Sequence, residues 1–208
     1  MANKQELRSE ETKRAIVAAA GALFAERGFD AVTMREIAKQ AGCSHTTIYI
    51  YFKDKTALLH QLSMPPLEQL KERFDSILQS KALAPEDKVK GIGEEFIRFC
   101  LANRNMYPIF FVTKSVRVDE AEPELEVNRL RNALFAQFME GIRQCLRLEE
   151  EDDRLLAYSR IMVYTVHGIV ATYNQSEETV DQLMDRLNAT FAEAIDVLLL
   201  GFRRKMEE

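Results

Sequence analysis

The segment from Thr33 to Lys55 constrains the fold of this chain most strongly, because it combines two helix starts and one helix stop. Its sequence is TMREIAKQAGCSHTTIYIYFKDK. Thr33 and Glu36 have the spacing of a capping box, in which each side chain accepts a hydrogen bond from the other residue's backbone N–H. Gly42 is suited to end that helix and Ser44 to begin the next one. The segment therefore predicts two short helices joined by a tight turn.

The apolar residues of this segment indicate which face of each helix is buried. Ile37, Ala38 and Ala41 share one face of the first helix. Ile48 and Phe52 share a face of the second, at the i, i+4 spacing of helix neighbours. The other side chains of the second helix are predicted to face outward: His45, Thr46, Thr47, Tyr49 and Ile50. This is the layout of a helix-turn-helix, whose second helix enters the DNA major groove with its N-terminal residues against base edges.

A longer segment, GFDAVTMREIAKQAGCSHTTIYIYFKDKTALL, resembles the TetR-type transcriptional regulators. It runs from Gly28 to Leu59 and follows a predicted helix over residues 11–27. The resemblance implies an all-α fold, with a three-helix DNA-binding head and a larger helical domain that binds an effector and forms dimers. We expect the head to span residues 10–60, with its helix-turn-helix motif at about 33–52. The effector and dimerisation domain is expected to span residues 61–208.

The resemblance also implies roles for the exposed side chains of the head. The residues expected nearest the bases are Arg35, His45, Thr46 and Tyr49. An arginine there is suited to read guanine, whereas histidine and threonine discriminate less between bases. The residues expected to position the DNA backbone are Thr33, Ser44, Thr47, Tyr51 and Lys55. Lys55 suits a phosphate because a cation is combined there with a helix N-terminus.

Two positions of the head depart from the family's pattern, and two tyrosines allow more than one reading. Thr46 stands where glycine or proline is common, and Ile50 stands where a polar residue is frequent. Ile50 either contacts a thymine methyl group or packs inside the head. Tyr49 and Tyr51 each either contact the DNA or belong in part to the core, and the DNA contact is favoured more for Tyr49.

The charge of the chain is unevenly divided between head and body. The whole chain carries a formal net charge of −5. Residues 1–60 hold nine Lys and Arg against seven Asp and Glu, a net of +2, and the rest holds 19 against 26, a net of −7. We expect the acidic body to stay off the phosphates while the head engages them. So small a positive charge predicts weak non-specific binding and dependence on a few placed contacts.

The rest of the chain shows helical periodicity, and no alternation is long enough to predict a strand. The pair Pro65-Pro66 is expected to break the helix that starts at Lys55, since proline cannot donate a backbone hydrogen bond. That break is the predicted mechanical link between head and body. The fold class is therefore all-α, with further helices predicted at about residues 55–63, 67–80, 85–100, 107–113, 124–148, 151–174 and 178–204.

The last two predicted helices, 151–174 and 178–204, indicate a homodimer. The first is apolar over most of its circumference between Ile161 and Val170. A helix that is apolar nearly all round must be buried on several sides. The body can cover one side and a second subunit the other, as a two-fold four-helix interface of the kind that TetR-like proteins form. Packing of both helices within a monomer core is the alternative.

An effector site is expected in the body. Two short segments, NRNMYPIFF at Asn103–Phe111 and YTVHG at Tyr164–Gly168, resemble the C-terminal domain of some TetR-type regulators. The candidate pocket residues are Phe96, Phe99, Phe110, Phe135, Phe138, Met162, Tyr164 and His167. A helical aromatic stripe is more often core, so each of these side chains also has a purely structural reading. Together they predict a small apolar or aromatic effector if a pocket lies between the helices.

The sequence disfavours other classes of protein. It has no HExxH, GxSxG, P-loop or Rossmann glycine pattern, and its three histidines limit metal or acid–base chemistry. We therefore expect no enzyme activity, no metal and no cofactor. A polar N-terminus and three scattered cysteines favour a cytoplasmic protein that does not enter a membrane.

The leading interpretation is a ligand-responsive regulator, a repressor by family precedent, that binds a palindromic DNA operator as a dimer. An effector would shift the body between two conformations and change the spacing of the heads. The sequence alone does not decide between repressor and activator. One alternative is a helical module that binds small molecules or proteins and does not use its helix-turn-helix on DNA. A second is an architectural DNA binder without sequence preference.

Overall fold

The computed structural model describes residues 4–117, 120 and 122–207, and within these residues every regular element is a helix. The prediction of an all-α fold is confirmed. The order along the chain is α1 (Lys4–Arg27), α2 (Met34–Gln40), α3 (His45–Tyr51), α4 (Lys55–Gln79), α5 (Pro85–Ala102), the π-helix η1 (Pro108–Val112), α6 (Glu126–Leu146), α7 (Asp153–Tyr173) and α8 (Val180–Met206).

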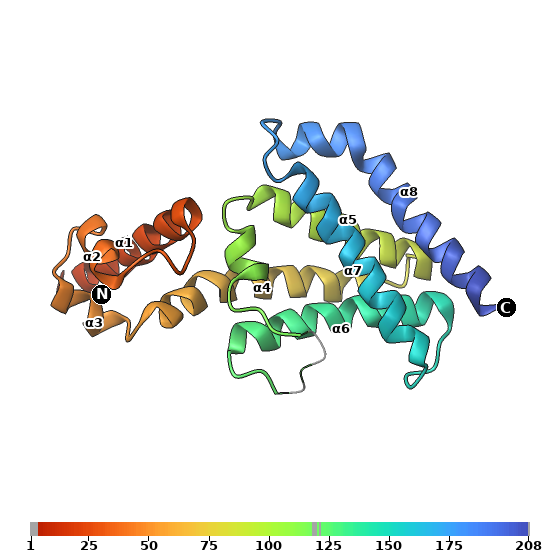
Figure 1. Ribbon diagram of the computed structural model, residues 1–208, viewed down its shortest axis with the longest axis horizontal. Helices are drawn as coiled ribbons and strands as arrows, with labels where there is room; N and C mark the ends of the chain where they lie inside the picture. Colours follow the sequence, from red (N-terminus) through yellow and green to blue (C-terminus); the bar gives the residue numbers. More distant parts are fainter. Residues whose placement is uncertain (1–3, 118–119, 121, 208) are drawn as a thin grey trace.

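The molecule has two parts connected by one long helix (Figure 1). Helices α1 to α3 form the head, and helices α5 to α8 with η1 form the body. Helix α4 runs from the head into the body, across the predicted domain boundary between residues 60 and 61. The N-terminal end of the described chain lies at the head and the C-terminal end at the far side of the body (Figure 1).

The local signals of the helix-turn-helix act as predicted. Thr33 Oγ1 accepts a hydrogen bond from the Glu36 amide at 3.3 Å, and Glu36 Oε2 accepts one from the Thr33 amide at 2.8 Å. Gly42 has a φ of +71°, a left-handed conformation that suits glycine because it lacks a Cβ atom. Ser44 Oγ accepts a hydrogen bond from the Thr47 amide at 3.0 Å and starts α3. These caps fix the turn between α2 and α3.

Side chains from three helices fill the core of the head. Ile37 and Ala38 of α2 and Ile48 of α3 are fully buried, together with Ile16 and Ala20 of α1. Ala38 provides no more than a methyl group at this point, which lets α2 approach its neighbours closely. The apolar face predicted for each short helix is therefore the face that is buried.

The prediction of a helix break at Pro65-Pro66 is wrong. Helix α4 continues without interruption from Lys55 to Gln79 with both prolines inside it. Each proline lacks an N–H, so the helix forgoes the hydrogen bonds that these two positions would donate. Leu59 and Leu67, on either side of the pair, are fully buried, and their packing keeps the helical path. The link between head and body is a continuous helix.

The body packs around the second half of α4. Helices α5 and α6 both pack against α4 and against each other, while α8 covers α5 and α7 lies against α5, α6 and α8. The short apolar helix predicted at residues 107–113 is η1, which contacts α1 and α4. This segment of the body therefore touches both the head and the connecting helix.

Helix α7 is long and apolar enough to cross a membrane by length and composition alone. Core helices of soluble proteins share these properties, so they are weak evidence of a span. Only 33% of its most apolar window is buried within the described chain. Much of this helix is therefore left for contact with something outside the protomer.

Candidate DNA-binding face and effector cavity

One face of α3 is open to solvent at the end of the head. His45, Thr46, Tyr49 and Ile50 are all exposed, and 75% of the Ile50 side-chain surface is accessible. Ile50 therefore does not pack inside the head. The Tyr49 ring meets the edge of the His45 ring, with 5.1 Å between the ring centroids. Four neighbouring positions thus present polar, aromatic and apolar groups together.

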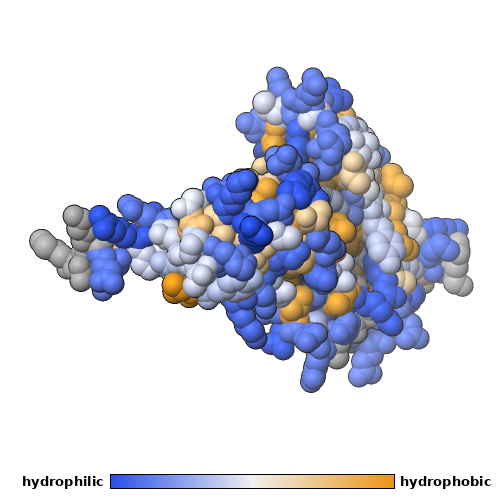
Figure 2. Space-filling view, turned by 60° about the vertical axis from the view of Figure 1, so that its left-hand side comes forward, coloured by the Kyte–Doolittle hydropathy of each residue, from blue (hydrophilic) through white to orange (hydrophobic). Residues whose placement is uncertain are grey.

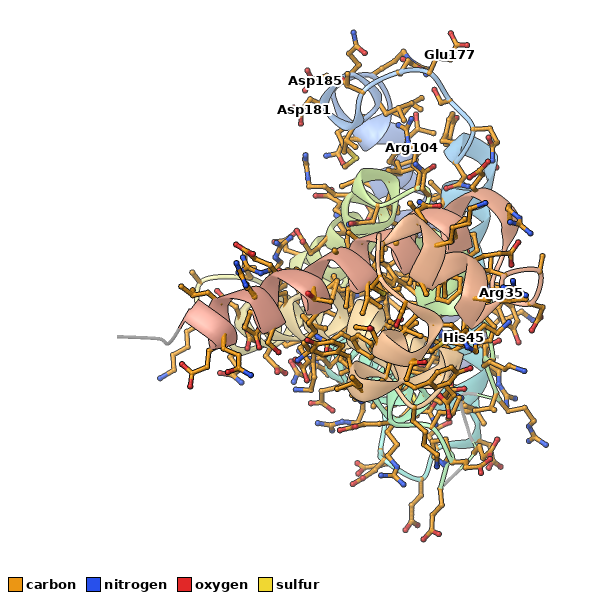
Figure 3. The ribbon with its side chains drawn as sticks, turned by 90° about the vertical axis from the view of Figure 1, so that its left-hand side faces the viewer. Arg35, His45, Arg104, Glu177, Asp181 and Asp185 are labelled. Carbon is orange, nitrogen blue, oxygen red and sulfur yellow. The ribbon has the colours of Figure 1, made fainter. Side chains whose placement is uncertain are left out.

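Arg35 adds a cation to this end of the head. It projects from α2 and is exposed, and Figure 3 shows it on the same side of the head as His45. The acidic residues Glu177 and Asp181 lie far from them, at the top of the body in Figure 3. These acidic residues of the body therefore lie away from the predicted recognition surface.

The residues predicted to position the DNA backbone differ from this group because most have partners inside the protein. Thr33 and Ser44 are the caps of α2 and α3, and the Thr47 hydroxyl lies 2.7 Å from Ser44 Oγ. The Tyr51 hydroxyl lies 3.1 Å from Ser9 Oγ and so ties α3 to α1. These side chains hold the recognition helix in place.

Lys55 also has internal partners. Its Nζ donates to the carbonyl oxygens of Phe29 at 2.8 Å and Asp30 at 3.3 Å, and it lies 4.7 Å from the centroid of the Phe29 ring. The exposed cations Lys39 and Lys53 have no such partner among the described residues. Sequence reasoning passed over these two lysines. Lys39 lies in the last turn of α2 and Lys53 lies two residues after α3, and this closeness to the motif could have identified them.

The start of α2 carries a strongly stabilised carboxylate. The pKa of Glu36 is lowered to about 2, first by the hydrogen bond from the Thr33 hydroxyl and then by the Arg27 guanidinium. Arg27 Nη1 lies 2.9 Å from Glu36 Oε1. The Glu36 carboxylate therefore stays charged at neutral pH, and the ion pair links the end of α1 to α2. Arg27 is therefore unavailable as a free cation for DNA.

A cavity of about 90 Å³ lies within the body between α5, η1, α6 and α7. Its aromatic lining comes from Phe96, Phe111, Phe135 and Phe138. The Phe96 ring is the centre of this group, because it meets the rings of Phe111, Phe138 and His167 at centroid distances between 4.8 and 5.9 Å. An apolar or aromatic group fits such a lining.

The structure brings together half of the side chains predicted for the effector site. Phe96, Phe135, Phe138 and His167 line the cavity. Three others, Phe99, Phe110 and Met162, are buried in the core outside the lining. Tyr164 lies on the outer face of α7 with 67% of its surface accessible. Helical spacing alone could not tell which of these side chains line the cavity, which are buried in the core and which face outward.

His167 has a defined partner and a shifted pKa. Its Nδ1 lies 2.8 Å from the Tyr107 hydroxyl, and burial lowers its pKa to about 4. Burial also raises the pKa of Tyr107 to about 12. Both groups are therefore neutral at neutral pH, and they place one polar pair in an aromatic wall.

Sequence reasoning missed the polar end of the cavity. Ser115, Asn128, Arg131 and Asn132 contribute to its lining. The asparagines and the arginine come from the first turns of α6. The sequence prediction for that helix used its apolar stripe and therefore named only apolar side chains. A buried arginine could not be recognised from its sequence context, because the same residue type is exposed at neighbouring Arg129.

Helices α7 and α8 share an exposed apolar face. Its members are Ile161 and Tyr164 of α7 and Val197 and Leu200 of α8. Gly168 and Gly201 have open space where a Cβ atom would stand. Figure 2 shows a run of hydrophobic side chains along the right-hand side of the body, with further hydrophobic side chains scattered over the middle of this face. Apolar side chains grouped in this way mark an interaction surface.

Comparison with known proteins identifies the family. Residues 16–62 match the family described as bacterial regulatory proteins, tetR family. A fatty acid metabolism regulator protein of Bacillus subtilis (strain 168) is 30% identical over 196 residues, which cover 91% of this chain and 95% of that protein. The chain belongs to the TetR family. It is a DNA-binding transcriptional regulator that responds to a ligand, as the segment from Gly28 to Leu59 implied.

Two further similarities extend along most of this TetR-family chain. The uncharacterized HTH-type transcriptional regulator YerO of Bacillus subtilis (strain 168) is 28% identical over 209 residues, 93% of this chain and 66% of YerO. The chain thus spans about two thirds of YerO. The crystal structure of FadR from Bacillus subtilis with stearoyl-CoA matches with a TM-score of 0.66 at 20% identity, over 88% of this chain and 96% of that one. At this identity the likeness concerns the fold.

Proposed function

We propose that this TetR-family protein is a homodimeric, cytoplasmic repressor that binds a palindromic operator and releases it when a small effector enters the body. Residues 10–60 are the DNA-binding unit in this proposal, and residues 61–208 are the effector and dimerisation unit. The observation that carries the proposal is the open face of α3, where exposed side chains such as His45, Tyr49 and Ile50 point to solvent and the surrounding side chains hold the helix in place.

The dimer is proposed to form through α7 and α8. The exposed side chains of Ile161, Tyr164, Val197 and Leu200 lie on these two helices, and two copies related by a two-fold axis would cover them in a four-helix interface. Such symmetry also places two recognition helices about one DNA turn apart, roughly 34 Å, as a palindrome requires. The incomplete burial of α7 within one protomer supports this arrangement.

On the DNA, the proposed contacts fall into two groups. Arg35, His45, Thr46 and Tyr49 are proposed to face base edges, and Ile50 to contact a thymine methyl group. Thr33, Ser44, Thr47, Tyr51 and Lys55 are proposed to fix the position of the helix at the DNA backbone, largely through the internal bonds described above. Lys39 and Lys53 are added here as phosphate contacts, since both are exposed and lie in or next to the helix-turn-helix.

The effector is proposed to bind the cavity between α5, η1, α6 and α7. Its phenylalanine lining suits an apolar body, and a relative named for fatty acid metabolism and a similar fold with stearoyl-CoA bound are consistent with a lipid-like ligand. Entry of such a ligand would shift the body between two conformations and change the spacing of the heads. Helix α4 connects the two parts.

Selection of bound sequences from a random duplex pool at moderate salt tests this function. We expect one palindrome to be enriched, with half-sites about one helical turn apart. Sedimentation of the free protein should show a dimer rather than a 23.9 kDa monomer. If no sequence is enriched and binding only fades as salt rises, the protein is a non-specific binder or a module that does not read DNA.

A further inference from the structure

Arg131 is the one charged side chain among the described residues that line the body cavity. Only 8% of its surface is accessible, and no carboxylate pairs with it in the described chain. Its guanidinium donates to the carbonyl oxygens of Phe110 at 2.5 Å, Ile109 at 2.9 Å and Thr113 at 3.0 Å. It also donates to Asn128 Oδ1 at 2.6 Å. All four acceptors are neutral groups.

A buried cation without an anion is costly, and the carbonyl dipoles at the end of η1 offset that cost only in part. Burial lowers the pKa of Arg131 to about 10, so the group still carries its charge at neutral pH. Four of its five N–H groups are used in the bonds above, which leaves one N–H for a further acceptor. The cavity wall therefore has an uncompensated positive charge with spare hydrogen-bonding capacity.

The cavity lining changes from polar to apolar along α6. Asn128, Arg131 and Asn132 occupy the first turns of the helix, and Phe135 and Phe138 follow further along it. A ligand lying along this wall would have its polar group near Arg131 and its apolar part near the phenylalanines.

We propose that the effector is an organic carboxylate with an apolar or aromatic body, whose carboxylate binds Arg131. This inference rests on the proposed function and gives the chemical class of the effector. A carboxylate supplies the missing negative charge and accepts charge-assisted hydrogen bonds from the guanidinium. The apolar part of the ligand lies against the rings of Phe96 and Phe138, away from the hydrogen bonds of Arg131.

Arg131 also connects the cavity to the head through a short chain of contacts. Asn128 accepts from Arg131 and donates through Nδ2 to the carbonyl oxygen of Lys114 at 2.9 Å. Lys114 has a φ of +53°, a strained conformation for a residue other than glycine, and its Nζ lies 5.9 Å from the Phe29 ring of the head. A carboxylate that draws Arg131 away from these acceptors would loosen the contact of Lys114 with Phe29.

The test compares acids with alcohols of the same carbon skeleton on the full-length protein. The pairs are butyrate and butanol, octanoate and octanol, and phenylpropionate and phenylpropanol, with affinities measured by calorimetry. We expect at least one acid to bind about 10- to 100-fold more tightly than its alcohol, the range for hydrogen bonds to a charged group. Equal affinity within each pair, or no binding by any compound, overturns the proposal.

Two variants locate the preference at Arg131. Arg131→Met should remove it, and Arg131→Lys, which keeps the charge without the planar fork, should reduce it without abolishing it. Arg129→Met is the matched control, because Arg129 is an exposed arginine on the same helix outside the cavity lining. A preference that survives in Arg131→Met overturns the assignment. If Arg131→Met does not fold, the acid–alcohol pairs measured on the wild type and on Arg131→Lys still test the assignment.

Selection of an operator tests the proposed regulator function independently of the carboxylate site. An operator that is enriched without any acid preference leaves the regulator intact and removes the carboxylate site. An acid preference without an enriched operator does the reverse. For the contact chain, Lys114→Ala should bind octanoate as the wild type does, while the octanoate-induced change in operator affinity shrinks by roughly 2- to 30-fold. An unchanged response in Lys114→Ala overturns the route through Lys114.

Discussion

In the head, the side chains proposed to read DNA come largely from the seven residues of α3, and the caps that fix α2 and α3 act within three positions of the chain. In the body, the cavity joins Phe96, Arg131 and His167, which belong to three different helices. The head thus presents a surface set by local sequence, whereas the body builds a site from distant segments. Local patterns such as caps and turns therefore predict which side of a short helix is exposed better than they predict the lining of a cavity.

The largest expected effect comes from breaking the proposed dimer, which tests whether operator binding by the two heads requires the interface in the body. Leu200→Glu places a charge in the exposed apolar face of α8 and should convert the dimer to a monomer. Operator affinity should then fall roughly 10²- to 10⁴-fold, because the two heads no longer bind as one unit. Sedimentation and a DNA titration measure both effects. Leu83→Glu, an exposed leucine between α4 and α5, is the control and should leave both unchanged.

The next effect concerns the half-buried His167 of the body. The folded pKa of His167 is about 4 and the ordinary value is 6.5, so the unfolded chain binds more protons between these values. The free energy of unfolding should fall by up to about 3 kcal/mol as pH drops from 6.5 to 4. His167→Gln should lack this contribution, as denaturation at several pH values can show. Tyr107→Phe should retain it, since burial causes the shift.

Loss of one base contact should weaken the head without altering the body. Arg35→Ala is expected to reduce operator affinity by about 1–3 kcal/mol and to relax the sequence preference at one base pair. Lys53→Ala, which removes a proposed phosphate contact, should weaken binding to all sequences alike and lower its salt dependence. Equal loss on operator and random DNA for Arg35→Ala would reassign Arg35 to the backbone.

The smallest expected effect separates positioning from reading within the head. Tyr51→Phe removes the hydroxyl that bonds Ser9 and should lower the stability of the protein by about 1 kcal/mol. Sequence preference should not change, because Tyr51 is proposed to hold α3 rather than to face a base. Thermal unfolding and selection from the random pool measure the two properties. A changed palindrome would place Tyr51 among the base-reading residues.

The head was predictable because its signals act over one or two helical turns. The capping box of Thr33 and Glu36, the Ser44 cap and the left-handed Gly42 all act within a few residues, so the order of residues determines them. The apolar faces of α2 and α3 followed from periodicity for the same reason. The all-α class and most helix positions in the body were predictable on the same grounds.

The tertiary structure decided features that depend on contacts between distant residues. Local chemistry favoured a break at Pro65-Pro66. However, α4 continues through both prolines, and Leu59 and Leu67 on either side of them are buried in the core. Of the predicted aromatic residues, Phe135 lines the cavity while Tyr164 faces outward, because orientation toward neighbouring helices separates them. The sequence alone determined the all-α class, the caps of α2 and α3 and which side of α3 faces outward. Only the fold could bring Arg131 beside the aromatic cavity without a counter-ion, since burial and pairing are properties of the surroundings of a residue.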